Sequence, residues 1–111
     1  MAEYKRYITQ VQENGNVMIS EDVIATIVTH AVEEVEGVEG LRTKKSWGKV
    51  MKIVIAEDNN LTIDCNITVK FGYSVVDVAT NVQQAITGAV ESITGVKVTV
   101  VNVNVGGIAR Q

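Results

Sequence analysis

The most constraining feature of this sequence is a strict alternation of apolar and polar residues in LTIDCNITVKF, residues 61–71. Successive side chains of a β-strand point to opposite faces of its sheet, so the alternation predicts a strand with one apolar face. Such a strand is typical of an antiparallel sheet that is covered on a single side. The rest of the chain must therefore supply the covering layer. The apolar members of the pattern are Leu61, Ile63, Cys65, Ile67, Val69 and Phe71.

Two other segments have the helical period that a covering layer needs. In the first, Ser20 is a suitable N-cap, and Gly37 is a suitable stop after the apolar stripe. The second begins with a capping box from Ser74 to Asp77 and stops at Gly95. The predicted buried stripes are Val23, Ile24, Ile27, Val28, Ala31, Val32 and Val35 in the first helix, and Val75, Val78, Val82, Ala85, Ile86, Ala89, Val90 and Ile93 in the second.

The remaining apolar runs predict strands at residues 17–19, 38–41, 50–56 and from 96 onward, with a hairpin turn at 57–60. The order β-α-β-β-β-α-β predicts an α+β two-layer sandwich. In it, two amphipathic helices pack on one face of a mostly antiparallel four- to five-stranded sheet. The chain of 111 residues suits one such domain. We expect residues 1–14 to be a flexible N-terminal tail and residues 15–111 to be a single α+β domain.

The last strand changes its phase halfway along VKVTVVNVNV, residues 96–105. A β-bulge at Val100–Val101 would restore the phase and leave Asn102 and Asn104 on the polar face. The alternative is an unbroken strand whose second half is buried against another subunit. We prefer the bulge, because a slip of one residue otherwise turns the last valines toward water. Under both interpretations, we expect contacts between chains at the end of this strand.

The charges are unevenly distributed, although the net charge is only −3. Four acidic residues at 33–39 are followed directly by the positive residues of 42–52, which gives a dipolar arrangement. No apolar run has the ~20 residues that cross a bilayer, and no signal peptide is visible. A lone cysteine does not indicate an oxidising compartment. These features predict a soluble, cytoplasmic protein.

The inventory of reactive side chains is short. His30 and Cys65 are the single histidine and the single cysteine, so one chain cannot assemble a zinc tetrahedron from them. Cys65 falls on the apolar face of its strand, where a thiol is inert packing, and His30 is expected at the surface of the first helix. The acidic residues near Gly37 occupy a solvated helix end rather than a dry cleft. We therefore expect no enzymatic activity and no cofactor.

Two exposed segments are candidates for binding a partner. The basic loop contains Arg42, Lys44, Lys45, Trp47 and Lys49, which could contact phosphates while the indole stacks on a base. Its alternative roles are a solvated loop that pairs with the preceding acids, or an indole that packs against a protein. On the second helix, the face away from the core includes Asn81, Gln84 and Gly88. An interior glycine costs about 1 kcal/mol relative to alanine. Gly88 therefore indicates either close approach by the first helix or a second protomer, or simple tolerance.

Several segments in the right order resemble the alkaline shock protein family of bacteria, a general-stress or envelope stress response family. They are NGNVMISEDVIATIV, AVEEVEGVEGL, YSVVDVATNVQQAITGAVESITGVKV and VNVNVGGI, which together cover most of residues 14–108. The resemblance implies a non-enzymatic cytoplasmic protein linked to cell-envelope homeostasis. Some members are held at the membrane by a separate anchored partner. Many relatives have a longer segment where this chain has only RTKKSWGK, residues 42–49.

Together, these features predict an envelope stress response protein that acts as an interaction or scaffold module at the cytoplasmic side of the cell envelope. We expect it to self-associate and to bind a membrane-anchored protein, without inserting into the membrane itself. Its candidate partner-binding residues are those of the basic loop, the second helix and the last strand, with Asn102 and Asn104 in the last. The alternative function is a small nucleic-acid-binding domain that uses the basic loop 42–52.

Overall fold

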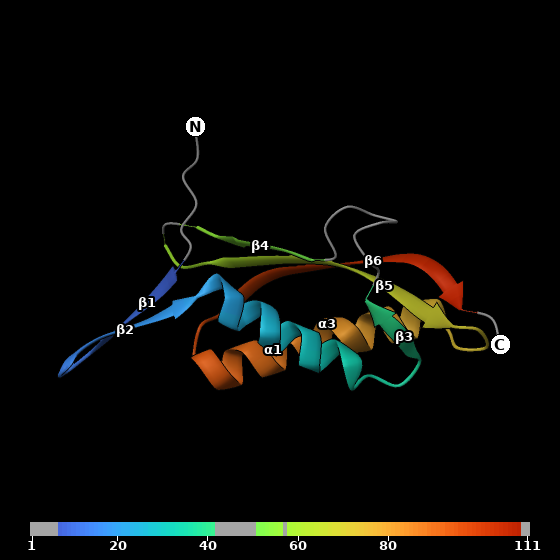
Figure 1. Ribbon diagram of the computed structural model, residues 1–111, viewed down its shortest axis with the longest axis horizontal. Helices are drawn as coiled ribbons and strands as arrows, with labels where there is room; N and C mark the ends of the chain where they lie inside the picture. The colour runs from blue at the N-terminus through green and yellow to red at the C-terminus, as the bar shows by residue number, and fades with distance from the viewer. Residues whose placement is uncertain (1–6, 42–50, 57, 110–111) are drawn as a thin grey trace.

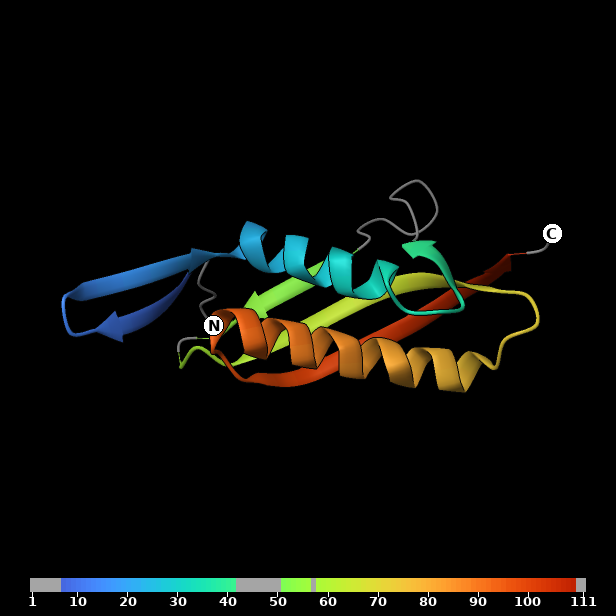
Figure 2. The same cartoon turned by 90° about the horizontal axis from the view of Figure 1, so that it is seen from below.

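A computed structural model of the protein describes residues 7–41, 51–56 and 58–109 (Figure 1). Its elements are β1 (Tyr7–Gln12), β2 (Gly15–Ser20), α1 (Glu21–Glu33), β3 (Val38–Leu41), β4 (Met51–Ile55), β5 (Leu61–Lys70), α3 (Val75–Thr94) and β6 (Val98–Ala109). The two helices lie side by side on one face of a four-stranded sheet, as Figure 2 shows. The predicted α+β sandwich is therefore confirmed, with one additional strand at the start.

The strand β5 is the centre of the sheet. β4 pairs with its first half and β3 with its second half, both antiparallel, whereas β6 pairs with it in parallel along its whole length. Because a strand has two edges, β3 and β4 share one edge of β5 and β6 occupies the other. No strand of the described residues pairs with the second edge of β6, which is therefore an outer edge of the sheet as described.

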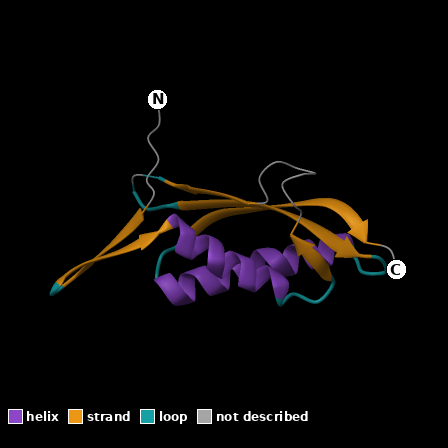
Figure 3. Cartoon of the chain, in the orientation of Figure 1, coloured by secondary structure: helices purple, strands orange, loops and turns teal. Residues whose placement is uncertain are grey.

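The alternation in β5 has the predicted consequence. Leu61, Ile63, Cys65, Ile67 and Val69 are all fully buried under the helices. Their intervening polar neighbours lie on the opposite face, which Figure 3 shows free of helices. Phe71 does not follow this pattern and is 65% exposed, because β5 ends at Lys70 and the chain turns at Gly72 with φ +103°.

Both helices begin at the predicted caps. The hydroxyl oxygen of Ser20 accepts a hydrogen bond from the backbone N–H of Val23, and that of Ser74 accepts one from Asp77, each at 3.3 Å. The helix α1 stops earlier than predicted: its C-cap is Glu34, and Gly37 forms the turn into β3. The exceptions to the predicted stripes are Val23 in the first turn of α1 and Ile93 in the last turn of α3, which are both exposed. In α3 the buried stripe runs at strict i, i+4 spacing: Val78, Val82, Ile86, Val90 and Thr94.

Residues 7–12 form β1, where the sequence predicted the flexible tail. β1 and β2 make a separate two-stranded hairpin that projects from one end of the molecule (Figures 1 and 2). Several contacts of the described residues hold its base against the body. Ile8 is fully buried in the core, Gln10 Nε2 donates to the carbonyl of Thr94 at 3.1 Å, and Asn59 Nδ2 donates to the carbonyl of Thr9 at 3.4 Å. Tertiary contacts therefore order a segment that is weakly patterned by itself.

The change of phase in β6 is produced by a β-bulge, which is the interpretation that we preferred from the sequence. The register passes from Leu61–Val98 to Thr62–Val100, so the extra residue is Thr99, just before the predicted Val100–Val101 pair. Val101, Val103 and Val105 then pack against the core. A second register shift follows at Gly106, which the sequence did not predict.

Candidate functional site

The basic loop lies outside the described residues. Arg42, Lys44, Lys45, Trp47 and Lys49 are the candidates concerned. Of the basic run, Lys52 is described; it lies on β4 and is exposed. The hypothesis of nucleic-acid binding through this loop therefore stays a prediction.

The candidates on α3 lie on the outward side of the helix layer. Asn81, Gln84 and Gly88 are exposed, whereas Val82 and Ile86 on the opposite side of the helix are fully buried. Apart from the adjoining backbone of α3 itself, no atom of the described residues lies within 4 Å of the position that a Cβ on Gly88 would occupy. The first helix therefore does not approach this glycine, and of the predicted causes only a second protomer or simple tolerance remains.

The candidates on β6 belong to the polar outer face of the sheet. Asn102 is in register with Asp64 and Asn104 with Asn66, so these four side chains form a compact group across two strands. Asn102 Nδ2 donates to Asp64 Oδ1 at 2.6 Å. Because the helices cover the inner face, this group and the candidates on α3 lie on opposite sides of the molecule. The fold thus offers two separate polar surfaces.

The side chains that the sequence offered as possible reactive groups, Cys65 and His30, do not form a site together. Cys65 is fully buried, and burial, with a smaller effect of the Asp64 carboxylate, raises the pKa of its thiol to about 11. The thiolate is the reactive form, so this cysteine is inert packing, as predicted. His30 is exposed in the last turn of α1. Within the described ranges, no three His, Cys, Asp or Glu side chains are grouped so that they could hold a metal ion.

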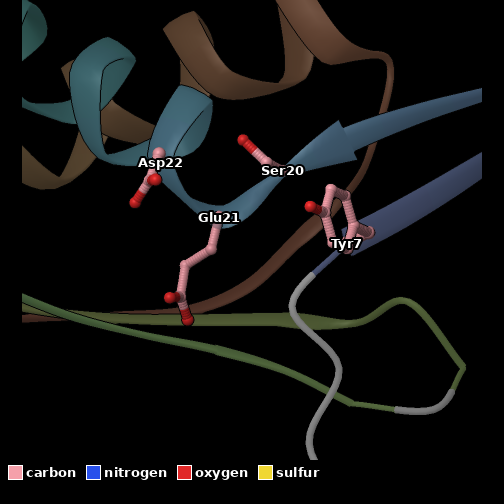
Figure 4. Close-up of a pocket in the computed structure, with 4 residues that line it drawn as sticks. All are labelled: Tyr7, Ser20, Glu21 and Asp22. Atoms are coloured by element: carbon pink, nitrogen blue, oxygen red, sulfur yellow. The ribbon is translucent and has the colours of Figure 1, made fainter.

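A shallow depression lies where the hairpin joins α1. Tyr7, Ser20, Glu21 and Asp22 line it, as Figure 4 shows, and its volume is about 70 Å³. The Ser20 hydroxyl already caps the helix, which leaves a phenol and two carboxylates around an open space. Ligand pockets for drug-sized molecules measure about 300–1,000 Å³. This depression is too small for such a ligand.

The sequence interpretation missed the exposed apolar side chains of the hairpin. Tyr7, Val11, Val17 and Met18 are exposed, and Val11 is 81% exposed. Strand-forming residues before the Asn14-Gly15 turn were the signal that could have revealed this hairpin. A second group of exposed apolar side chains belongs to the turn after β5, the start of α3 and the end of β6: Phe71, Tyr73, Val76 and Ile108. Figure 1 shows these segments at the end of the molecule opposite to the hairpin.

Comparison with known proteins identifies the family. The model of the alkaline shock protein 23 family, which is described as having a cell envelope-related function, matches residues 9–110. The chain belongs to this family. The alkaline shock protein resemblance is thereby confirmed, and the function of this family member is related to the cell envelope.

Relatives and solved structures agree with this family assignment and with the fold. The chain is 31% identical over 105 residues to the uncharacterized protein Spy1535 of Streptococcus pyogenes serotype M6, and the match covers 87% of this chain and 81% of that protein. It is 32% identical over 105 residues to the uncharacterized protein YqhY of Bacillus subtilis, and here the match covers 85% of this chain and 77% of that protein. The copper form of MamM CTD superposes with a TM-score of 0.60 at 17% identity, covering 78% of this chain and 85% of that one. Identity this low supports the fold alone. None of the described helices is long and apolar enough to cross a membrane.

Proposed function

We propose that this protein is a non-enzymatic interaction module at the cytoplasmic side of the cell envelope, where it self-associates and binds a membrane-anchored protein. The observation that carries the proposal is the match of residues 9–110 to a family with a cell-envelope-related function. A chain without a described spanning helix reaches the envelope most simply through an anchored partner.

The distribution of exposed apolar side chains supports an interaction role. Most of those described belong to the hairpin or to the segments at the opposite end of a molecule that measures 52 × 29 × 18 Å (Figure 1). Apolar side chains grouped on a surface mark contact sites for other proteins more often than isolated ones do. The hairpin is the better candidate for the anchored partner, because a two-stranded ribbon is barely stable alone and gains most from a contact along its length.

The chemistry of the described residues supports a role without catalysis. Burial keeps the Cys65 thiol protonated, and the depression at the hairpin base is small and open. General acid–base catalysis needs a titratable group held against its substrate in a concave site.

Membrane rebinding tests the proposal. Washed membranes of the native host are mixed with the purified full chain, either directly or after protease treatment, and vesicles of extracted lipid serve as a parallel sample. We expect binding to untreated membranes and loss of binding after proteolysis or on lipid alone. The double substitution Val11→Ser with Met18→Ser should weaken binding. The control Thr26→Ser changes an exposed residue of α1 and should leave it unchanged.

The contradicting outcome is also specific. A chain that stays entirely in the supernatant, together with a deletion strain whose envelope tolerates alkaline and cell-wall stress normally, would exclude the proposed role. Binding to lipid vesicles as strong as binding to membranes would replace the protein partner by a lipid surface.

A further inference from the structure

The outer edge of β6 presents backbone groups for which the described part of the chain provides no strand. The carbonyl of Val101 accepts a hydrogen bond from Gln83 Nε2 on α3 at 3.1 Å, so the peptide groups of Val101 point toward this outer edge. Peptide groups alternate in direction along a strand, so those of Val103 and Val105 point the same way. The peptide groups of Asn102 and Asn104 point instead toward β5.

Two bulges enclose a regular stretch of this edge. The register shifts fall at Thr99 and Gly106, and residues 100–105 run between them without irregularity. Val103 lies near the middle of that stretch. An antiparallel copy of the same stretch, centred on Val103, would place Val101 opposite Val105 and Asn102 opposite Asn104. The edge is therefore complementary to itself.

The side chains beside this edge are incompletely covered. Val101, Val103 and Val105 are only half-buried, whereas Ile63, Cys65 and Ile67, their register partners on β5, are fully buried. The helix layer ends over β6, and a further strand alongside it would cover the three valines. Cross-strand pairs of β-branched side chains stabilise such a contact.

Between its two bulges, this edge lacks the charged side chains that keep sheet edges apart. Natural edge strands carry charged side chains that oppose pairing with another chain. No residue of Val98–Ala109 is charged, and α3 has no charged residue between Asp77 and Glu91. Pairing two copies of this strand would therefore bring no like charges of the strands themselves against each other. The hydrogen bond from Gln83 is compatible with pairing, because a carbonyl oxygen has two lone pairs.

We propose that β6 is the self-association edge of this protein: two copies pair their β6 strands antiparallel about Val103 and join their sheets into one. This inference rests on the self-association in the proposed function and names the surface that performs it. Such a contact is isologous, so it closes on itself as a two-fold dimer. In it, each copy's Asn102 lies opposite Asn104 of the other copy on the polar face of the joined sheet.

Disulfide cross-linking between two single-cysteine variants tests the register. In an antiparallel pair without mutual hydrogen bonds, Cα atoms are about 4.5 Å apart, within the range for a disulfide. We expect a mixture of Asn102→Cys and Asn104→Cys chains to form a covalent heterodimer under mild oxidation. The matched control mixes Asn102→Cys with Asn66→Cys, on the same face but one strand further from the edge. Cys65 is buried and stays silent in both mixtures.

The mass in solution provides an independent measurement. Light scattering should give twice the mass of one chain for the native protein. Val103→Pro removes the outward N–H of Val103 but none of the bonds to β5, so it should reduce the mass to that of one chain. Val103→Thr keeps the N–H and the side-chain shape, and it should remain a dimer. Circular dichroism and thermal unfolding establish that both variants are folded; should Val103→Pro unfold, the cross-linking result decides.

Each result either supports or overturns the assignment. Cross-linking in the first mixture alone, with a dimeric native chain, supports it. A native chain that is monomeric at high concentration, as expected if a strand of another protein occupies the edge, overturns it. An oligomer that persists in Val103→Pro, with equal cross-linking in both mixtures, overturns the β6 assignment and leaves the proposed self-association intact through another surface.

Discussion

Replacing Gly37 by alanine tests how closely the turn after α1 packs against α3 and β5. Gly37 has a φ of +97°, and its carbonyl accepts a hydrogen bond from the backbone N–H of Lys70 at 2.7 Å. A Cβ at this position would lie 2.8 Å from Val78 Cγ2 and 2.9 Å from Tyr73 Cδ2. The substitution therefore has a backbone cost and a packing cost.

The two costs can be estimated separately. A left-handed backbone costs an L-residue roughly 1–2 kcal/mol. Overpacking typically costs about 1–3 kcal/mol. The ring of Tyr73 is partly exposed and can move outward, but Val78 is buried, and its branched side chain is rigid in a helix. We expect Gly37→Ala to lower the free energy of unfolding by about 2–5 kcal/mol.

Alanine substitutions at two other glycines distinguish the backbone cost from the packing cost in a urea titration followed by circular dichroism. Gly72 has nearly the same φ, +103°, but beyond its chain neighbours no described atom lies within 4 Å of its Cβ position, so Gly72→Ala should show the backbone cost alone. Gly88→Ala has neither cost and should raise the free energy of unfolding by about 1 kcal/mol. Equal losses in Gly37→Ala and Gly72→Ala would refute the contact with Val78 as the origin of the packing cost.

Three further predictions concern burial, capping and pH. Ile8→Ala should lower the free energy of unfolding by about 2–5 kcal/mol and speed hydrogen exchange of the hairpin amides, whereas Val11→Ala should stay within about 0.5 kcal/mol. Ser74→Ala should cost about 1 kcal/mol in the same titration, because the N–H of Asp77 loses its acceptor. Folding raises the pKa of the Cys65 thiol from 9.0 to about 11, so the unfolded thiol loses its proton at a lower pH than the folded one. The free energy of unfolding should therefore fall as the pH rises from 9 to 11. Cys65→Ala should remove this contribution to the pH dependence. A native thiol that reacts with iodoacetamide as fast as the denatured one would contradict this burial.

The candidate surfaces were only partly accessible to sequence reasoning. Asn102 and Asn104 were placed on the polar face of the last strand, because the phase of a strand can be read from the alternation of its side chains. The hairpin surface around Val11 and Met18 was missed, because a short segment before a turn carries little pattern. Its order depends on Ile8 and Gln10 reaching elements far away in the chain.

Local patterning was enough to specify both helices and strand β5, together with the faces that most of their residues occupy. The alternation in residues 61–71 and the i, i+4 stripe of α3 depend on local geometry alone, and so do the Ser20 and Ser74 caps. Sequence also predicted the hairpin of β4 with β5, but the place of the hairpin β1–β2 and the positions of β3 and β6 beside β5 emerged only in the folded chain. Among the described residues, folding placed β6 at an outer edge of the sheet beside β5, packed no other element against Gly88, and left Phe71 exposed beyond the end of its strand. Coverage of a residue depends on what packs against it, and a periodic pattern records which way a side chain points but not what lies there.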